Sequence, residues 1–153
     1  MKDIAPRTVV YLKCRGSWRQ LPDMVARLNG YVSRSSLTVT GSASGVYHNT
    51  PDEASVPDLE WEVFYQVEAE TPESGNDKDG FGIRYLPEVM AASIIHRGSY
   101  RKAGSSYRRL EEWIRREGFE VCGPSEEVYL AVFDVPSEGQ IIEIRLPVRP
   151  SVM

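Results

Sequence analysis

Two glutamates, Glu62 and Glu143, and two tyrosines, Tyr47 and Tyr129, stand at matching places in apolar segments of this chain. Aromatic rings attract cations and stack on flat apolar molecules, while a carboxylate among them supplies a counter-charge. Such a set indicates a site for an apolar, cationic or aromatic small molecule. Three alternatives stay open: Glu62 and Glu143 as polar residues on a wet sheet face, Arg145 as the cation that neutralises Glu143 across the strand, and the tyrosines as ordinary packing.

Other chemistries find less support in the residues. His48 and His96 have no neighbouring set of metal ligands, and Cys14 and Cys122 lie far apart without a Cys-x-x-Cys pattern. The serine pairs lack a histidine and an aspartate in an arrangement for nucleophilic catalysis. We therefore expect no metal, no cofactor and reduced thiols.

The composition is that of an ordinary globular protein. The chain has 153 residues, of which 41% are hydrophobic and 26% are charged, enough for one domain with a buried core. Its net charge of −4 argues against direct nucleic-acid binding. Basic residues between Arg97 and Arg116 alternate with glutamates, which predicts a solvated, ion-paired helix face. Without a signal-peptide or membrane-spanning pattern, we expect a cytoplasmic location and no membrane contact.

The chain also repeats itself. Arg15-Gly16-Ser17-Trp18 reappears as Arg97-Gly98-Ser99-Tyr100, and the same offset of 82 residues relates Tyr47 to Tyr129. The register then slips by one residue towards the end of each copy. Self-similarity at a fixed offset indicates a duplicated unit. The predicted organisation is a single domain, 1–153, with two copies, about 5–68 and 87–149, joined by an acidic Pro/Gly linker, 68–80.

Each copy is predicted to form a strand, a helix and a hairpin, because alternation marks strands and spacings of three and four mark helices. Gly118 is expected to stop the second helix. The helical stripes are Leu21, Val25, Leu28 and Val32 in the first copy and Ala103, Tyr107, Leu110 and Ile114 in the second. Strands are predicted at 7–15, 37–47, 59–67, 90–97, 126–133 and 141–148, a loop at 49–58, and helices from Pro22 and at 104–117.

Two helices cover one side of these strands. We therefore predict an α+β fold, a tandem duplication of a strand-helix-hairpin unit, with a curved antiparallel sheet, helices on one face and a ligand cleft on the other. Alternation places Val46 and Val128 under the helices, whereas Glu126 and Glu127 are interpreted as solvated turn residues. Trp18 and Tyr100 either cap the cleft or pack at the helix starts. The predicted cleft residues are Tyr11, Trp18, Tyr47, Glu62, Phe64, Tyr100, Tyr129, Glu143 and Arg145.

Several ordered segments carry a resemblance to a known family. They are His96–Tyr100, Tyr107–Ile114, Gly123-Pro124, Glu127–Leu130 and Glu143–Val148, with Val9–Gly16, Gly45–Tyr47 and Glu62-Val63 in the first half. Together they resemble the GyrI-like small-molecule-binding domains, effector-binding modules also found at the C-termini of many AraC- and MerR-type transcription regulators. The resemblance covers nearly the whole chain.

The resemblance implies multidrug-type binding in a cleft between the copies, with Glu143 as the pocket carboxylate and Tyr129 lining the cleft. Burial would raise the pKa of Glu143, so that it favours a cation over water. Two departures stand out. The usual Asn-Asp-Pro turn is replaced by Ala131–Pro136, and no helix-turn-helix segment precedes the domain, so we expect no direct binding to DNA.

Two functions stay open on this basis. The favoured one is a stand-alone protein that binds apolar, cationic or aromatic small molecules. The alternative is a hydrolase of cyclopropane-containing electrophilic toxins, with Glu143 as general base and Tyr129 as donor to the developing oxyanion. The implied protein partners are a transcription regulator or, with the least support, DNA gyrase; monomer and dimer are both compatible with the sequence.

Overall fold

The computed structural model describes residues 1–48 and 59–152, so the loop predicted at 49–58 lies outside the described residues. The chain divides into two compact units. One unit is Pro6–Pro87, and the other combines Met1–Ala5 with Glu88–Met153. The predicted copies, 5–68 and 87–149, and the cleft between them stay predictions.

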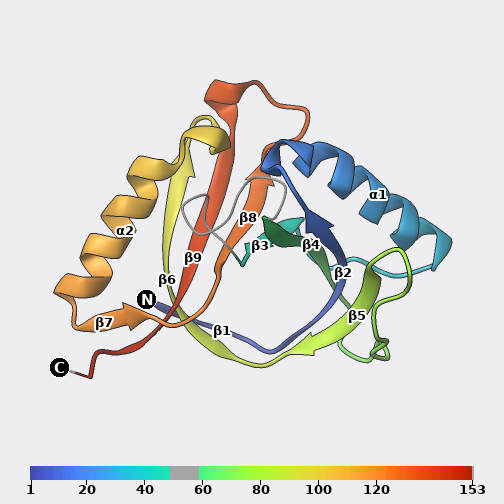
Figure 1. The fold of residues 1–153 in the computed structure, drawn as a ribbon, viewed down its shortest axis with the longest axis horizontal. Helices are drawn as coiled ribbons and strands as arrows, with labels where there is room; N and C mark the ends of the chain where they lie inside the picture. The colour runs from blue at the N-terminus through green and yellow to red at the C-terminus, as the bar shows by residue number, and fades with distance from the viewer. Residues whose placement is uncertain (49–58, 153) are drawn as a thin grey trace. The chain divides into compact units, whose positions relative to one another are not determined.

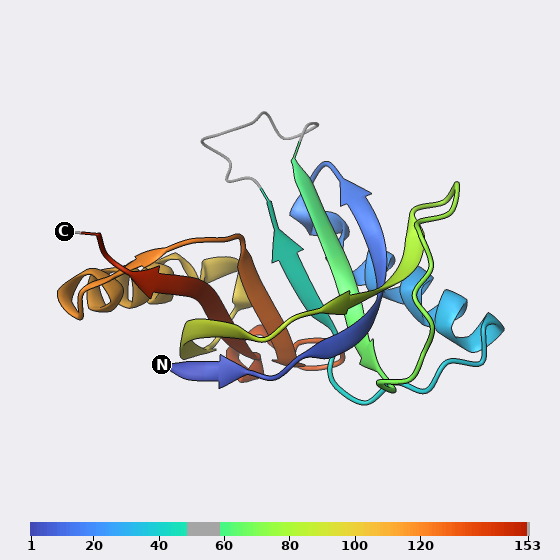
Figure 2. The ribbon, with the colours of Figure 1, turned by 90° about the horizontal axis from the view of Figure 1, so that it is seen from below.

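The unit Pro6–Pro87 is an antiparallel sheet with one long helix. The strand order is β3-β4-β2-β5, and Figure 2 shows α1 alongside β2 and β4. A short 3-10 turn, Trp18–Gln20, leads from β2 into α1. The elements are β2 (Arg7–Arg15), α1 (Leu21–Arg34), β3 (Ser44–Tyr47), β4 (Glu60–Val67) and β5 (Phe81–Leu86).

The second unit has a similar order of elements. Its strands run β1-β6-β9-β8 with antiparallel pairing, and β7 also pairs with β9. Figure 1 shows α2 alongside β6 and β9. The elements are β1 (Lys2–Ile4), β6 (Val89–Arg97), α2 (Gly104–Arg116), β7 (Phe119–Val121), β8 (Ser125–Ala131) and β9 (Ile141–Pro150).

The α+β class and the antiparallel pairing are as predicted, but six strands were expected. The described residues form nine, because β1, β5 and β7 add to the predicted set. The strand expected at 37–47 is shorter than predicted and covers Ser44–Tyr47, with one isolated bridge from Val39 to Val67 before it. Gly41, which precedes β3, explains part of this shortening, since glycine weakens a strand.

The helical stripes pack onto the sheets as their spacing predicts. α1 buries Leu21, Val25 and Leu28, and α2 buries Leu110 and Ile114. Burial of these apolar side chains is the main stabilising term for both helices, each side chain contributing about 1.5–3 kcal/mol. α2 ends before Gly118, whose φ of +84° is a left-handed conformation that glycine adopts without strain.

A buried polar contact fixes α2 against β6. The imidazole of His96 lies 2.8 Å from the Ser106 hydroxyl through Nδ1 and 2.9 Å from the carbonyl oxygen of Ser99 through Nε2. Because His96 is opposite Ile142 in the ladder, this contact also identifies the face of β9 that α2 covers.

In the unit Pro6–Pro87, the sheet face away from α1 is also apolar. Val9, Tyr11 and Phe64 form a buried cluster there, and Val46 and Leu86 pack against it. Both faces of β2, β3 and β4 therefore carry apolar side chains. A rule that assigns apolar residues to a single inner face cannot decide the orientation of such strands.

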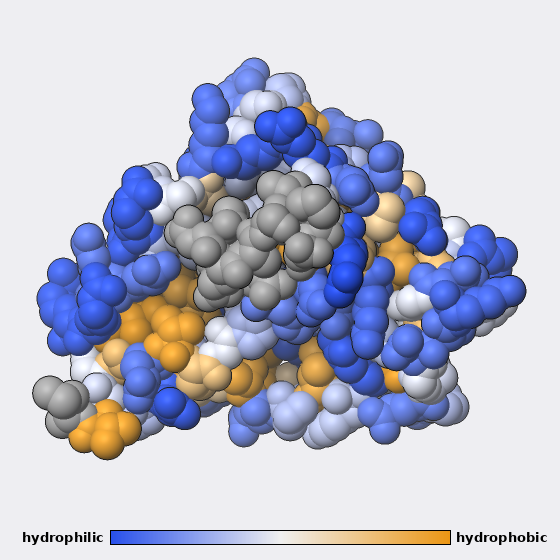
Figure 3. Space-filling view, viewed as in Figure 1, coloured by the Kyte–Doolittle hydropathy of each residue, from blue (hydrophilic) through white to orange (hydrophobic). Residues whose placement is uncertain are grey.

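The outer surface of α2 is hydrophilic, as Figure 3 shows. It carries exposed arginines at 108, 109, 115 and 116. An ion-paired face was expected, yet none of these four makes an ion pair within residues 1–48 and 59–152. The pairing part of that prediction is therefore wrong. In the same described residues, neither helix has the length and apolarity needed to cross a membrane.

Candidate functional site

The hairpin tyrosine of the second unit faces the helix. In the antiparallel ladder Tyr129 is opposite Ile142, and Val128 is opposite Glu143. Directly opposed residues share a sheet face, so Tyr129 lies on the face that α2 covers and Val128 lies with Glu143. The predicted orientation of Tyr129 and Val128 is wrong. Tyr129 is 3% exposed, so its ring is part of the packing under α2.

The matching tyrosine of the other unit is also reversed. Tyr47 is opposite Trp61, and Val46 is opposite Glu62. The Tyr47 ring stacks 6.0 Å from Trp61 and meets Trp18 edge-on at 5.3 Å. These three rings lie on the α1 side of the sheet. The Trp18 indole nitrogen is buried and has no hydrogen-bond acceptor among the described residues.

Glu143 lies on the sheet face away from α2, as predicted, but two cations neutralise it. Lys2 Nζ is 2.5 Å from one carboxylate oxygen, and Arg145 Nε is 3.2 Å from the same oxygen. Arg145 also contacts Glu126 at 3.0 Å. Burial acts to raise the pKa of Glu143, but hydrogen bonds and charges from Arg145 and Lys2 outweigh it, so the net shift is downward. The expected increase of this pKa is wrong.

Glu62 is buried with a cation of the same unit. The Arg84 guanidinium forms a two-nitrogen ion pair with its carboxylate, and His48 Nε2 lies 3.3 Å away. Arg84 also stacks over the Tyr11 ring, at 4.5 Å from the centroid. Phe64 packs against that ring. The structure thus brings Tyr11, Glu62 and Phe64 together as predicted, with the chain's own guanidinium in the position expected for a ligand cation.

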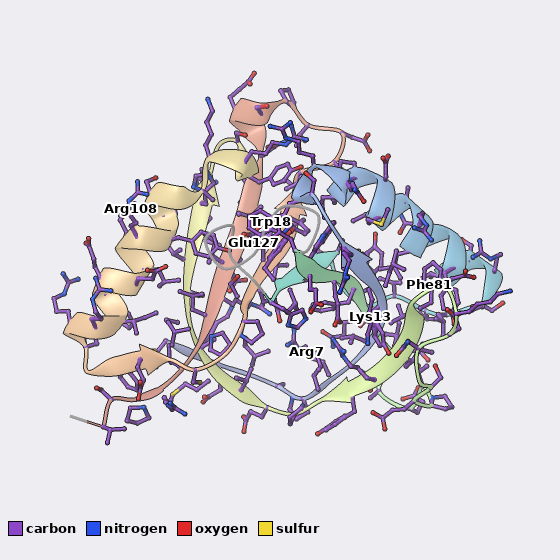
Figure 4. All side chains as sticks on the ribbon, in the orientation of Figure 1. Arg7, Lys13, Trp18, Phe81, Arg108 and Glu127 are labelled. Atoms are coloured by element: carbon purple, nitrogen blue, oxygen red, sulfur yellow. The ribbon has the colours of Figure 1, made fainter. Side chains whose placement is uncertain are left out.

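A third carboxylate, that of Glu127, makes no ion pair with any side chain in residues 1–48 and 59–152. Glu127, on β8, is opposite Ile144 and so faces α2. It accepts hydrogen bonds from the hydroxyls of Tyr107 and Tyr129, the second at 3.4 Å. Burial raises the pKa of Glu127, and these two hydrogen bonds offset the increase in part. Its side chain is half-buried, so it keeps access to solvent. Figure 4 labels Glu127 in the region between α2 and β8.

Further aromatic rings pack against Tyr129, one of the two tyrosines that contact this carboxylate. Tyr129 meets Tyr100 edge-on at 6.1 Å and Phe133 edge-on at 6.0 Å. Arg101 stacks on the outer side of this group, 5.7 Å from the Tyr100 ring centroid. We name Glu127, Tyr100, Tyr107, Tyr129 and Phe133 the Glu127 cluster. Within the described residues, no cationic side chain makes an ion pair with Glu127.

The Glu127 cluster combines a carboxylate with aromatic rings, which is the kind of cation-binding site that the sequence analysis predicted around Glu143. A partly desolvated carboxylate among aromatic rings favours a lipophilic cation, because removing such a cation from water costs less free energy than removing a small hydrated ion. The sequence interpretation of Glu127 as a solvated turn residue is wrong. Two signals point to it: Glu127 is two residues before Tyr129 and therefore on its face, and Tyr107 is in the helical stripe. Repeat matching could not find it, because its counterpart 82 residues earlier is Gly45.

Comparison with known structures reveals the same fold. EcmrR, in a cryo-EM structure of an EcmrR–DNA complex, is 20% identical with a TM-score of 0.82, covering 99% of this chain and 56% of that one. This chain therefore spans about half the length of EcmrR. The crystal structure of the EcmrR C-terminal domain is 19% identical with a TM-score of 0.81, covering 97% of this chain and 95% of that one.

Two further proteins are similar at lower identity. A hydrolase encoded by lin2189 from Listeria innocua is 13% identical, with a TM-score of 0.72 and coverage of 97% of this chain and 91% of that one. SAV2435 bound to tetraphenylphosphonium is 17% identical, with a TM-score of 0.58 and coverage of 97% and 92%. No curated protein matches the sequence. The model of the GyrI-like small molecule binding domain matches residues 1–149, and the chain therefore belongs to the GyrI-like family.

Proposed function

We propose that this domain binds an apolar, cationic small molecule through the Glu127 cluster. The observation that carries the proposal is the contrast between three buried or half-buried glutamates. Glu62 is neutralised by Arg84, Glu143 is neutralised by Lys2 and Arg145, and Glu127 contacts two phenolic hydroxyls. A carboxylate with neutral partners keeps its charge available to a ligand.

The rings supply the remaining selectivity. Tyr100 and Phe133 are half-buried and flank the buried Tyr129 ring, whose hydroxyl contacts the carboxylate, and an aryl cation gains cation–π attraction from their accessible parts. Membership of the GyrI-like small molecule binding domain family supports a ligand-binding role. SAV2435, a fold relative, has been solved with tetraphenylphosphonium, which belongs to the proposed ligand class.

The test uses two probes with the same shape and opposite charge, tetraphenylphosphonium and tetraphenylborate, measured by isothermal titration calorimetry. Glu127→Gln should weaken tetraphenylphosphonium binding about tenfold, because a charge-assisted contact is worth roughly 1.5 kcal/mol or more. Glu143→Gln is the matched control and should change the affinity less than about twofold. Loss of binding in Glu143→Gln with no effect in Glu127→Gln would move the site to Glu143.

The hydrolase alternative is favoured by one observation. A carboxylate whose pKa is raised and which contacts a tyrosine hydroxyl has the parts of a general base beside an oxyanion donor. Glu127 would take a proton from water as the water oxygen bonds to a ring carbon and a ring C–C bond breaks, its electron pair moving into a carbonyl conjugated with the ring. The Tyr129 hydroxyl would turn from Glu127 to hydrogen-bond to the resulting enolate oxygen, and the proton held by Glu127 would then pass to the enolate. Glu143, whose pKa is lowered, is a weaker base for this role.

Mass spectrometry of a cyclopropane-bearing alkylator incubated with the protein distinguishes the two functions. Turnover that disappears in Glu127→Gln, while tetraphenylphosphonium binding by the wild type persists, would support the hydrolase. If the alkylator stays unchanged when the protein is present in stoichiometric amount, the hydrolase is excluded and ligand binding remains as the proposed function.

A further inference from the structure

A groove separate from the Glu127 cluster lies on the unit that contains α2. It runs between the C-terminal half of α2 and β6 and has a volume of about 390 Å³. Small-molecule sites commonly have volumes of about 300–1,000 Å³. The groove is lined by residues outside the Glu127 cluster, and it uses a different part of the helix.

The inner surface of the groove is largely apolar. Ile94 contributes from β6, and Leu110 and Trp113 contribute from α2. Leu110 is 4% exposed, whereas Ile94 and Trp113 are half-buried and so remain accessible. In Figure 3, apolar surface lies next to the hydrophilic surface of α2. A half-buried indole beside two aliphatic side chains offers a flat surface on which an aromatic ring can stack.

The rim of the groove is cationic. Arg109 and Arg116 both line it, with Glu112 between them. The two arginines are seven residues apart, so they lie on one helix face with about 10 Å of axial separation. Neither guanidinium makes an ion pair within the described part of the chain. Two unpaired guanidinium groups at the edge of an apolar groove match a carboxylate, sulfonate or phosphate group.

We propose that this α2 groove binds amphipathic anions, that is, molecules with an aromatic ring and one acidic group. The ring stacks on Trp113 over Ile94 and Leu110, and the acidic group lies between Arg109 and Arg116. Glu112 opposes the anion, which limits affinity and disfavours a highly charged ligand. The charge preference is the opposite of that proposed for the Glu127 cluster, so the same domain distinguishes two classes of small molecule at two sites.

The experiment uses 2-naphthalenesulfonate and 2-naphthyltrimethylammonium, which share a ring and differ in charge. Calorimetric titration of the wild type should show tighter binding of the sulfonate at this groove. Arg109→Gln/Arg116→Gln should weaken sulfonate binding about fivefold to tenfold. Arg108→Gln/Arg115→Gln is the matched control, because it removes the same charge from the same helix outside the groove. Figure 4 labels Arg108 on the outer side of α2.

A third variant tests the sign of the charge effect. Glu112→Gln should strengthen sulfonate binding severalfold, since it removes the opposing carboxylate. Glu127→Gln should leave sulfonate binding unchanged, so that failure of the proposed cation site and failure of this site are separate results. In a 1H–15N spectrum, the largest shifts on sulfonate addition should occur at Ser93, Ile94 and Leu110.

Three results would overturn the proposal. An equal loss in the two arginine double variants would mean a general effect of net charge. Unchanged sulfonate affinity in Arg109→Gln/Arg116→Gln would exclude these guanidinium groups. Amide shifts that cluster on residues outside the groove would place the anion elsewhere. Urea unfolding of each variant confirms that the folded state is retained.

Discussion

The hydroxyl of Tyr107, on α2, donates a hydrogen bond to the carboxylate of Glu127, on β8. One bond therefore joins the helix to the strand at the candidate site. Tyr107 is neutral, so the bond orients Glu127 without cancelling its negative charge. This is the physical difference from Glu62 and Glu143, each of which contacts cationic side chains.

Glu127 should give the protein a specific pH dependence. Its folded-state pKa is raised above the ordinary value of 4.5, so the folded state binds this proton more tightly than the unfolded state. The resulting stability is present below pH 4.5 and is lost as the pH rises through the raised pKa. Glu127→Gln should remove this loss, and it should be more stable than the wild type at pH 7. Urea unfolding of both proteins between pH 4 and pH 8 measures this pH dependence of the free energy of unfolding. Parallel plots of that free energy against pH for the two proteins would contradict the prediction.

Glu143 should act with the opposite sign. Its pKa is lowered, so its contribution is present above the ordinary value of 4.5 and is lost as the pH falls through the folded-state pKa. Glu143→Gln should destabilise the protein at pH 7 by about 1–3 kcal/mol, because Arg145 loses a charged partner. Lys2→Gln is the graded control and should cost less than about 1 kcal/mol, since Lys2 is 42% exposed. Equal losses would show that burial of Glu143 does not matter.

Much of the fold could be predicted because local patterns were decisive. β2 has the bounds expected for it, 7–15, since its β-branched run ends at a glycine, and α2 starts at the predicted residue, Gly104. The orientation of β3 and β8 could not be predicted in the same way. Val46 and Tyr47 are both apolar, and both sheet faces bury apolar side chains there, so the pattern does not favour either face.

The candidate site was missed for a related reason. Glu127 stands next to Glu126, and a pair of acids suggests solvent. Glu126 is instead 8% exposed and contacts Arg145, while Glu127 faces Tyr107 on a helix some 20 residues earlier. Contacts between distant segments decide which acids are buried, and a single sequence does not contain them directly. The pairing of Glu143 with Lys2 depends in the same way on β1, a three-residue strand too short to predict.

Gly82 should be intolerant of a side chain. A Cβ at this position would meet the Tyr11 ring, including its hydroxyl oxygen. That ring is 4% exposed and packs with Val9 and Phe64, so it has little room to move. Gly82→Ala should cost about 1–3 kcal/mol in chemical unfolding. Gly41→Ala is the control, because its Cβ would lie 3.9 Å from the nearest atom, on Gln66.

A double-mutant cycle identifies the cause of the Gly82 effect. Tyr11→Leu should reduce the additional cost of Gly82→Ala, since it removes the ring that the new Cβ meets. If the cost of Gly82→Ala is the same in both backgrounds, the clash with Tyr11 is not its origin.

Arg84 should be required to balance Glu62. Arg84→Ala leaves a carboxylate that is 6% exposed with His48 as its neighbour, and should destabilise the protein by about 2–3 kcal/mol. Glu62→Gln added to Arg84→Ala should recover part of this loss, because the uncompensated charge is gone. Thermal unfolding of the single and double variants measures both terms. A double variant no more stable than Arg84→Ala would show that the uncompensated charge is not the cause of the loss, and would assign it to the lost stacking of Arg84 on Tyr11.

The strand β1 has a consequence for biosynthesis. It pairs with β6, in the unit that otherwise begins at Glu88, so the residues of β1 are translated well before their ladder partners, Val89–Ala91. Pro6–Pro87 is contiguous and can form its contacts as it is translated, whereas Lys2 can contact Glu143 only after β9 has been translated. A nascent chain halted between β6 and β9 could therefore pair β1 with β6 but would lack Glu143, so Lys2 would have no carboxylate partner there.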